Sequence, residues 1–318
     1  MGLEGLRAAL GERAVQGELL SKHTTFGIGG PADLFVIART LSELRTTIGL
    51  AWNHDVAYFL LGSGANIVVA DRGIRGLVIK NECAAITTSA GESEDGWIVR
   101  AESGAEIKTV ARSSIERGLA GLEWAVDVPG TVGGAVVGNA GAFGGYVADS
   151  LRNVLTLSRE EGESWWPRER LGLAYRTSAL KRVEKTGAFR PVILEATFEL
   201  RYEGPVPVHA RAAEYSRRRA QMQPSGPSAG SIFKRTEQYP AGFLIENAGL
   251  KGTRVGGAIV SPKHANFILN TGTATAQDVR DLVDLVQQSV QRKFGILLEP
   301  EIEFVGDWQA AGEGLGNQ

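Results

Sequence analysis

The sequence predicts a mixed α+β fold built from two or three packed units. The chain has 318 residues, which is long for a single hydrophobic core. Strand-like and helical runs alternate over residues 1–80, strand patterns dominate residues 81–205, and residues 206–306 contain the clearest helical periodicity. We therefore expect unit boundaries near residues 80 and 205, followed by a tail over residues 307–318.

The expected elements follow this division in order. An amphipathic helix is expected over residues 3–20, where Leu3, Leu6 and Leu10 share a face. Further elements of the first unit are strands at 33–38, 57–61, 67–69 and 76–79 and a helix at 41–54. In the second unit we expect strands at 97–101, 154–157 and 192–200 and a helix at 106–117.

The third unit is set off by a stretch that interrupts both periodicities. Two prolines and a glycine at 203–208 predict a linker, after which a basic helix is expected around 210–220. Thr275 and Asp278 have capping-box spacing at the start of a long helix that continues through Val290. A final strand is expected at 301–305, after Pro300.

Composition excludes several classes of protein. The 34 basic and 36 acidic residues give a net charge of −2 without a long single-sign run, so neither nucleic acid nor an anionic membrane is an expected partner. One cysteine and four histidines predict no disulfide and no metal site. The N-terminus lacks a signal-peptide pattern and no window holds eighteen apolar residues. We expect a cytoplasmic monomer.

Glycine is concentrated in three segments that we call the first (24–33), second (60–67) and third (128–145) glycine segments. Glycine lets successive backbone amides converge on an anion, and each segment also carries Ser, Thr or Asn donors. The second segment follows a strand, but it lacks the third glycine and the following helix of a dinucleotide-binding loop. Each segment alone is compatible with a simple tight turn. Three together favour a nucleotide cofactor.

Short motifs then make a family resemblance specific. In order along the chain they are FGIGGPAD (26–33), GSGAN (62–66), VPGTVGGA (128–135), NAGA (139–142), YRTS (175–178), GSIFK (230–234), AGLKG (248–252), SPKH (261–264) and LEPE (298–301). This series resembles the UDP-N-acetylenolpyruvoylglucosamine reductases, from about residue 22 to 305. The resemblance implies a vanillyl-alcohol-oxidase-like FAD-binding domain in two parts, residues 1–80 and 81–205. A C-terminal α+β substrate-binding domain, residues 206–306, would follow.

The resemblance also implies an activity and its cofactors. NADPH would reduce UDP-N-acetylglucosamine enolpyruvate to UDP-N-acetylmuramate by way of FAD, in the synthesis of peptidoglycan precursors. Residues implied to bind FAD are Thr25, Gly27, Gly29, Gly30, Gly62, Ser63, Gly64, Ala65, Asn66, Pro129, Gly130, Thr131, Gly133, Gly134, Asn139 and Gly141.

Three residues are implied to be catalytic. Arg176 would stabilise the enolate, because its planar fork suits carboxylates. Ser231 would donate the proton, although Ser225 and Ser228 nearby are equally suitable on chemical grounds alone. Glu301 would assist, but Glu299, Glu301 and Glu303 alternate as they would on a solvated strand face.

Four residues are implied to bind the substrate or NADPH. They are Tyr175, Arg218 (with Arg219 as the alternative), Lys234 and His264. An arginine cluster is more often a solvated face, and a lone histidine is more often structural.

The sequence departs from the family pattern in three places. Ala65 replaces a usual serine, which puts one hydroxyl contact to the FAD diphosphate in doubt, and Ala229 replaces a frequent cysteine. The stretch between Tyr175 and Ser231 is short, as in the subgroup that lacks a tyrosine-bearing substrate loop. Two alternative functions stay open: a flavin oxidase of the same superfamily, and a nucleotide-binding protein without catalysis.

Overall fold

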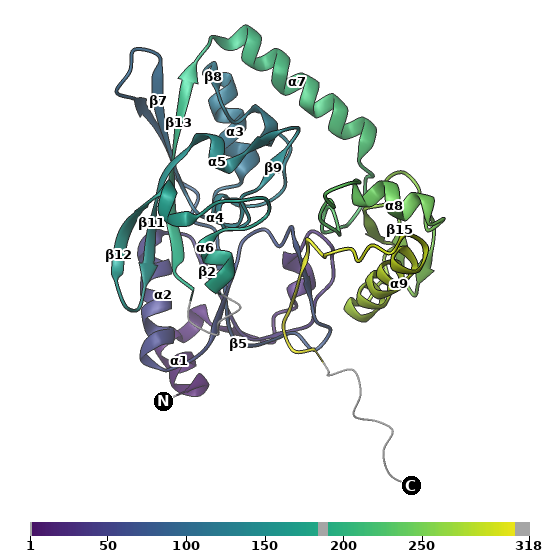
Figure 1. Ribbon diagram of the computed structural model, residues 1–318. Coiled ribbons are helices and arrows are strands. Elements are labelled where there is room, and N and C mark those ends of the chain that lie inside the picture. Colours follow the sequence, from purple (N-terminus) through teal and green to yellow (C-terminus); the bar gives the residue numbers. More distant parts are fainter. Residues whose placement is uncertain (1, 184–189, 309–318) are drawn as a thin grey trace.

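The computed structural model describes residues 2–183 and 190–308, which form three groups of elements, and the long helix α7 connects the second group to the third (Figure 1). The predicted tail falls largely on 309–318 and lies outside the described residues. Among the described residues, no helix is long and apolar enough to cross a membrane.

The first group is a small α/β unit. Its elements are α1 (Leu3–Leu10), η1 (Gly11–Arg13), β1 (Val15–Gln16), η2 (Leu20–His23), β2 (Ala32–Ala38), α2 (Leu41–Asn53), β3 (Tyr58–Leu61), β4 (Ile67–Val69) and β5 (Ile74–Asn81). One sheet has the order β1-β2-β5-β3, in which β5 runs parallel to both of its neighbours. The α2 helix packs Leu44, Ile48 and Ala51 into the core beneath it.

The helix expected over residues 3–20 is wrong in length, because α1 ends at Leu10. Gly11 has φ +60, and its amide caps the helix by donating to the carbonyl of Arg7. A residue in this region of backbone space ends a helix, and glycine enters it without steric cost.

The second group is built on an antiparallel sheet of order β12-β11-β13-β7-β6. Its elements are β6 (Ile86–Ala90), β7 (Gly96–Glu102), α3 (Ile107–Glu116), β8 (Leu119–Ala120), η3 (Glu123–Ala125), α4 (Val132–Val137), β9 (Gly141–Ala142), β10 (Gly145–Tyr146), α5 (Val147–Ser150), β11 (Leu151–Ser158), β12 (Gly162–Pro167), η4 (Arg168–Leu171), α6 (Ala179–Val183) and β13 (Val192–Tyr202). The predicted strands and the helix of this unit are confirmed to within a few residues. Helices α3 and α4 cover one face of the sheet and share its core.

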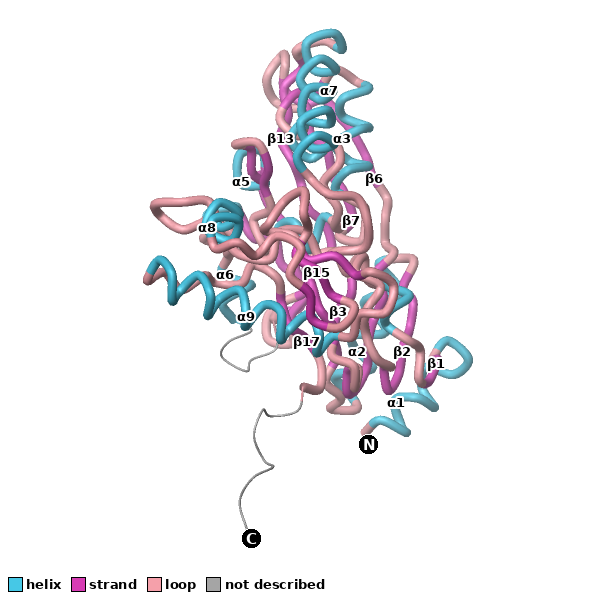
Figure 2. Tube along the Cα trace, turned by 90° about the vertical axis from the view of Figure 1, so that its right-hand side faces the viewer, coloured by secondary structure: helices cyan, strands magenta, loops and turns pink. Residues whose placement is uncertain are grey.

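The predicted linker at 203–208 is wrong, because α7 (Pro205–Met222) already begins there. Proline is tolerated in the first turn of a helix, where its missing N–H has no partner to lose. Arg211 anchors α7 to η3 through two hydrogen bonds to Oε1 of Glu123, at 2.8 and 2.6 Å. In the turned view α7 runs alongside α3 (Figure 2). Val208 and Ala212 of α7 belong to the same buried cluster as Ile115 of α3.

The last strand of the third group pairs with a strand of the first group. It contains α8 (Ala241–Asn247), β14 (Arg254–Val255), β15 (Ala258–Val260), β16 (Ile268–Asn270), α9 (Ala276–Phe294) and β17 (Glu303–Val305). The capping box of α9 is confirmed, since Thr275 and Asp278 each accept a hydrogen bond from the other's backbone amide at 3.0 Å. Strand β17 pairs parallel with β4, which brings residues 303–305 beside the end of the second glycine segment.

Candidate active site

A cavity of about 730 Å³ lies where the three groups meet. Segments far apart in the sequence line it, including the second and third glycine segments. The sequence-predicted residues in its lining are Thr25, Gly62, Ser63, Gly64, Ala65, Asn66, Pro129, Gly130, Thr131, Gly133, Gly134, Gly141, Arg176, Ser231 and Glu301. The cavity therefore gathers most of the predicted cofactor residues and all three predicted catalytic residues.

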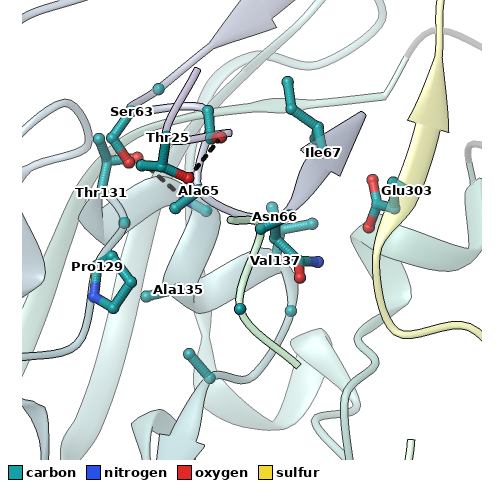
Figure 3. Close-up of a pocket in the computed structure, with 18 of the residues that line it drawn as sticks. Thr25, Ser63, Ala65, Asn66, Ile67, Pro129, Thr131, Ala135, Val137 and Glu303 are labelled. Carbon is teal, nitrogen blue, oxygen red and sulfur yellow. Dashed lines mark hydrogen bonds between the residues drawn. The ribbon is translucent and has the colours of Figure 1, made fainter. Parts of the chain in front are cut away.

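The second glycine segment forms one wall of this cavity (Figure 3). Thr25 fixes it, since its amide donates to the carbonyl of Gly64 at 3.2 Å and its hydroxyl to that of Ser228 at 2.8 Å. Within residues 2–183 and 190–308, no protein hydrogen bond uses a backbone amide of residues 63–66 as its donor. The hydroxyl of Ser63 is buried without a partner. Four backbone amides and one hydroxyl of a segment that lines the cavity are thus without a protein acceptor.

The third glycine segment packs directly against the second. Thr131 caps α4, accepting from the amide of Gly134, and it lies close to Ser63 in Figure 3. A Cβ on Gly62 would come within 2.5 Å of the Thr131 hydroxyl oxygen, so only glycine fits at this crossing. This close approach closes one side of the cavity.

Four predicted cofactor residues are absent from the cavity lining, and local packing accounts for each. Gly29 and Gly30 pack tightly: a Cβ on Gly30 would meet the carbonyl oxygen of Asp71 at 2.1 Å. Gly27 has φ +67 in a turn closed by the amide of Gly27 and the carbonyl of Thr24. Asn139 is buried and uses its side chain to tie the backbones of Ala148 and Ala174 together.

Arg176 and Glu301 form an ion pair across the cavity lining. Arg176 occupies a two-residue turn with φ +54, and its Nε lies 2.7 Å from Oε1 of Glu301. Its Nη2 donates to the carbonyl of Gly141 at 3.1 Å. The turn therefore directs the guanidinium at both the third glycine segment and Glu301.

Glu301 does not behave as part of a solvated strand face. The side chains of Glu299, Glu301 and Glu303 are 67%, 13% and 32% exposed. The predicted strand begins two residues late, because the amide of Glu301 donates to the carbonyl of Ile232 and the residue lies outside the β17 ladder. Burial raises the pKa of Glu301, and the positive charges of Arg176, Lys181 and Lys234 oppose that rise.

Ser231 lies in the cavity lining and forms an isolated bridge with Phe267. Ser228 lines the cavity as well, whereas Ser225 does not. The cavity lining thus excludes Ser225 as an alternative proton donor and leaves Ser228 as the alternative to Ser231.

The four predicted substrate-binding residues lie outside the cavity lining. The Tyr175 hydroxyl accepts from the amide of Arg235 at 3.2 Å, and Lys234 is paired with Glu299. His264 is half-buried, which lowers its pKa, and its Nδ1 accepts from the amide of Asn266. Arg218 stacks over the Phe143 ring at 5.3 Å.

Arg219, rather than Arg218, lines the cavity. Its burial lowers its pKa, and Nη1 donates to Gln223 at 2.9 Å. In the part of the chain that the structure describes, no carboxylate lies within ion-pair distance of Arg219. The charge of Asp127 acts on Arg219 from beyond that distance, and Asp127 is itself paired with Arg112. A desolvated guanidinium outside an ion pair is suited to an anionic ligand.

Sequence reasoning missed Lys181, Arg190 and Glu303, which also line the cavity. Lys181 and Glu303 pair at 2.6 Å, although they come from the second and third groups. No local pattern could have indicated a contact between such distant segments. Among the described residues, no group of three or more His, Cys, Asp or Glu could hold a metal ion.

Two family models and several known proteins match this chain. Residues 32–164 match the family model for an FAD binding domain, and residues 221–305 match that for the C-terminal domain of UDP-N-acetylenolpyruvoylglucosamine reductase. The reductase of that name from Lachnoclostridium phytofermentans is 41% identical over 297 residues, covering 93% of this chain and 94% of the relative. That from Exiguobacterium sibiricum is 42% identical over 307 residues, covering 96% and 97%.

The chain belongs to the UDP-N-acetylenolpyruvoylglucosamine reductase family. The crystal structure of the Thermus caldophilus reductase superposes with a TM-score of 0.75 at 33% identity, covering 92% of this chain and 98% of that one. The predicted family is thereby confirmed, as is the predicted fold of mixed helices and strands in which an FAD-binding domain precedes a C-terminal domain of this reductase. The FAD-binding match supports FAD as the cofactor of this family member.

Proposed function

We propose that this protein reduces UDP-N-acetylglucosamine enolpyruvate to UDP-N-acetylmuramate, with NADPH as reductant and FAD as bound cofactor. The observation that carries the proposal is the placement of Arg176, Glu301 and Ser231 in one cavity with the second and third glycine segments. The relatives named as this reductase, 41% and 42% identical over nearly the whole chain, support it. NADPH and a UDP-sugar are cytoplasmic compounds, so we propose a cytoplasmic enzyme acting as a monomer.

The residues present fit FAD. A dinucleotide cofactor carries a diphosphate, and the unpartnered amides of 63–66 with the buried Ser63 hydroxyl are matched donors for it. Ala65 offers its amide but no hydroxyl, so a hydroxyl contact from this loop to the diphosphate would come from Ser63. Thr131, Gly133, Gly134 and Gly141 would complete the binding surface. When bound, FAD supplies the redox chemistry between NADPH and the enolpyruvyl group.

Arg176 would bind the carboxylate of the enolpyruvyl group and stabilise the enolate that develops beside it. Its guanidinium is already oriented by Glu301 and Gly141, so little reorganisation accompanies the reaction. Ser231 would donate the proton that converts the enolate into product. Glu301, whose burial favours its protonated form, would assist this proton transfer.

Arg219 would bind the anionic end of the substrate. Arg219 is in no ion pair of the described residues, and Asp127, whose charge acts on it, is paired with Arg112, so the guanidinium can accept a diphosphate as a partner. The sequence-implied contributions of Tyr175, Arg218, Lys234 and His264 would require the substrate to extend beyond the cavity lining, where these side chains lie.

Anaerobic stopped-flow absorbance of the FAD-loaded protein tests the proposal. NADPH should bleach the flavin, and the enolpyruvyl sugar should then restore its colour. If only O₂ restores the flavin colour, the protein is a flavin oxidase instead. If the protein cannot bind FAD, it is a nucleotide-binding protein without catalysis.

Paired serine variants test the proton donor. We expect Ser231→Ala to keep bleaching by NADPH but to slow recovery by the enolpyruvyl sugar on the order of a hundredfold or more. Ser228→Ala is the matched control, since Ser228 lines the same cavity, and it should keep both phases. Equal loss in both phases for Ser231→Ala would show that the residue is not a proton donor.

A further inference from the structure

A second long-range ion pair lies beside the Arg176–Glu301 pair. Nζ of Lys181, on α6, is 2.6 Å from Oε1 of Glu303, on β17. The two side chains are 19% and 32% exposed, and both residues line the cavity. Figure 3 shows the Glu303 carboxylate on the side that faces Asn66 and the second glycine segment.

Lys181 belongs to the same short segment as Arg176. The hydroxyl of Ser178 donates to the carbonyl of Val137 at 2.6 Å and accepts from the amide of Lys181 at 3.2 Å. This bond fixes the start of α6 onto the end of α4. Ser178 thereby fixes the middle of the segment from Arg176 to Lys181 to α4. The ion pair of Lys181 with Glu303 fixes the end of this segment to β17.

Glu303 is held as firmly on the other side. Its amide donates to the carbonyl of Asn66 at 3.0 Å, and the Asn66 side chain donates to the carbonyl of Glu301 at 3.0 Å. Glu301 and Glu303 are therefore carried on one backbone stretch fixed to the second glycine segment. The Lys181–Glu303 pair sets the separation between this stretch and the one that carries Arg176.

We infer that Lys181, held by Glu303, is a positioning residue for the reaction: it keeps the Arg176 turn against Glu301 and supplies positive charge beside that carboxylate. This inference rests on the proposed function. Lys181 acts through Arg176 and Glu301 and not on the substrate itself.

The charges around Glu301 predict the direction in which its pKa moves when Lys181 or Glu303 is replaced. Three cations face Glu301: Arg176 and Lys181 from the second group and Lys234 from the third. Each lowers the pKa of Glu301 against the larger effect of burial. Removing the charge of Lys181 raises the pKa of Glu301 further. Removing the charge of Glu303 leaves Lys181 unneutralised, which shifts the pKa of Glu301 in the opposite direction.

Steady-state kinetics of the FAD-loaded protein across pH test the inference. Lys181→Met should lower kcat between about tenfold and a hundredfold, as small misplacements of catalytic groups do, and move the pH midpoint of kcat upward. Glu303→Gln should move that midpoint downward. The matched control is Arg45→Met, which breaks the long-range Arg45–Glu163 pair outside the cavity lining and should change neither quantity.

A conservative variant separates positioning from folding. Lys181→Arg keeps the charge and the reach to Glu303, so it should recover most of kcat and the wild-type midpoint. Circular dichroism melting and FAD titration establish that each variant is folded and loaded. Equal losses in Lys181→Met and Lys181→Arg with an unmoved midpoint would overturn the inference.

The same assay separates this inference from the proposed function. Normal turnover by the wild-type protein together with a wild-type kcat and midpoint in Lys181→Met would overturn the inference alone. No turnover by the wild-type protein would overturn the proposed function, and the inference with it.

Discussion

The first and second glycine segments have similar composition but opposite uses of their backbone amides. In the first, the amides of Gly27, Ile28 and Gly30 donate to protein oxygens, whereas that of Gly29 has no protein acceptor among the described residues. In the second, the amides of residues 63–66 have no protein acceptor among the described residues. Both segments contain glycines that a Cβ would force into neighbouring backbone. Glycine content therefore indicates close approach in both, and only unsatisfied donors indicate a ligand.

The first segment serves the packing between groups. Gly30 lies against the turn at 71–73, and the carboxylate of Asp71 accepts from the amides of Ala276 and Gln277 at the start of α9. This segment therefore supports the docking of the third group, while the second segment builds the cavity. Variants that separate stability from FAD affinity test this distinction.

The largest effect is expected for Gly30→Ala. Its Cβ would meet the Asp71 carbonyl oxygen at 2.1 Å and the Gly73 nitrogen at 2.6 Å, and backbone cannot yield cheaply. We expect a loss of roughly 3 kcal/mol in urea unfolding of the FAD-free protein, with unchanged FAD affinity in the folded fraction. Gly49→Ala is the control, since its Cβ meets nothing within 4 Å in α2, and it should be neutral or slightly stabilising. A selective loss of FAD affinity in Gly30→Ala would break the comparison.

A smaller effect is expected for Asp71→Ala. Its two carboxylate oxygens accept from Ala276 at 2.8 Å and Gln277 at 3.0 Å, capping α9 from another group. Loss of this cap should lower the free energy of unfolding by about 1–2 kcal/mol. Asp284→Ala, at an exposed position of α9, should have little effect on urea unfolding. Equal effects of the two variants would contradict a special role for Asp71.

Ser63→Ala should have the opposite effects to Gly30→Ala: it should lower FAD affinity and leave the stability of the FAD-free protein intact. Removing a buried hydroxyl without a partner should leave the FAD-free protein unchanged or up to about 1 kcal/mol more stable. FAD affinity should fall about five- to tenfold, the value of one hydrogen bond, as measured by fluorescence titration. A destabilised FAD-free protein with normal FAD affinity would show that Ser63 is structural.

The smallest effect concerns pH and the contact between the two segments. The carbonyl of His23 packs against Gly64, and Nε2 of His23 lies 2.9 Å from Oε1 of Glu18. Hydrogen bonding to His23 lowers the pKa of Glu18 below its usual 4.5, so the stabilisation is present above that value and is lost as pH falls through the lowered pKa. Urea unfolding of wild type and Glu18→Gln should therefore converge under strong acid. A difference that persists there would rule out this titration as its cause.

The sequence by itself determined the elements whose causes are local. The capping box at Thr275 and Asp278 and the strand runs of β2, β7 and β13 were predictable because periodicity and capping act within a few residues. The ordered motifs were enough to predict the family, and most of the residues that they implied to bind FAD line the cavity. Two local predictions failed at glycine and proline: Gly11 ended α1 early, and Pro205 began α7 where a linker was expected.

Only the tertiary structure decided which donors and charges face the cavity. The free amides of residues 63–66, the choice of Arg219 over Arg218 and the burial of Glu301 all depend on segments that meet from different groups. The Lys181–Glu303 pair is the clearest case, since neither residue carries a local pattern that indicates its partner. Side-chain environment is set by contacts across the whole chain, whereas sequence patterns report only on neighbours along it.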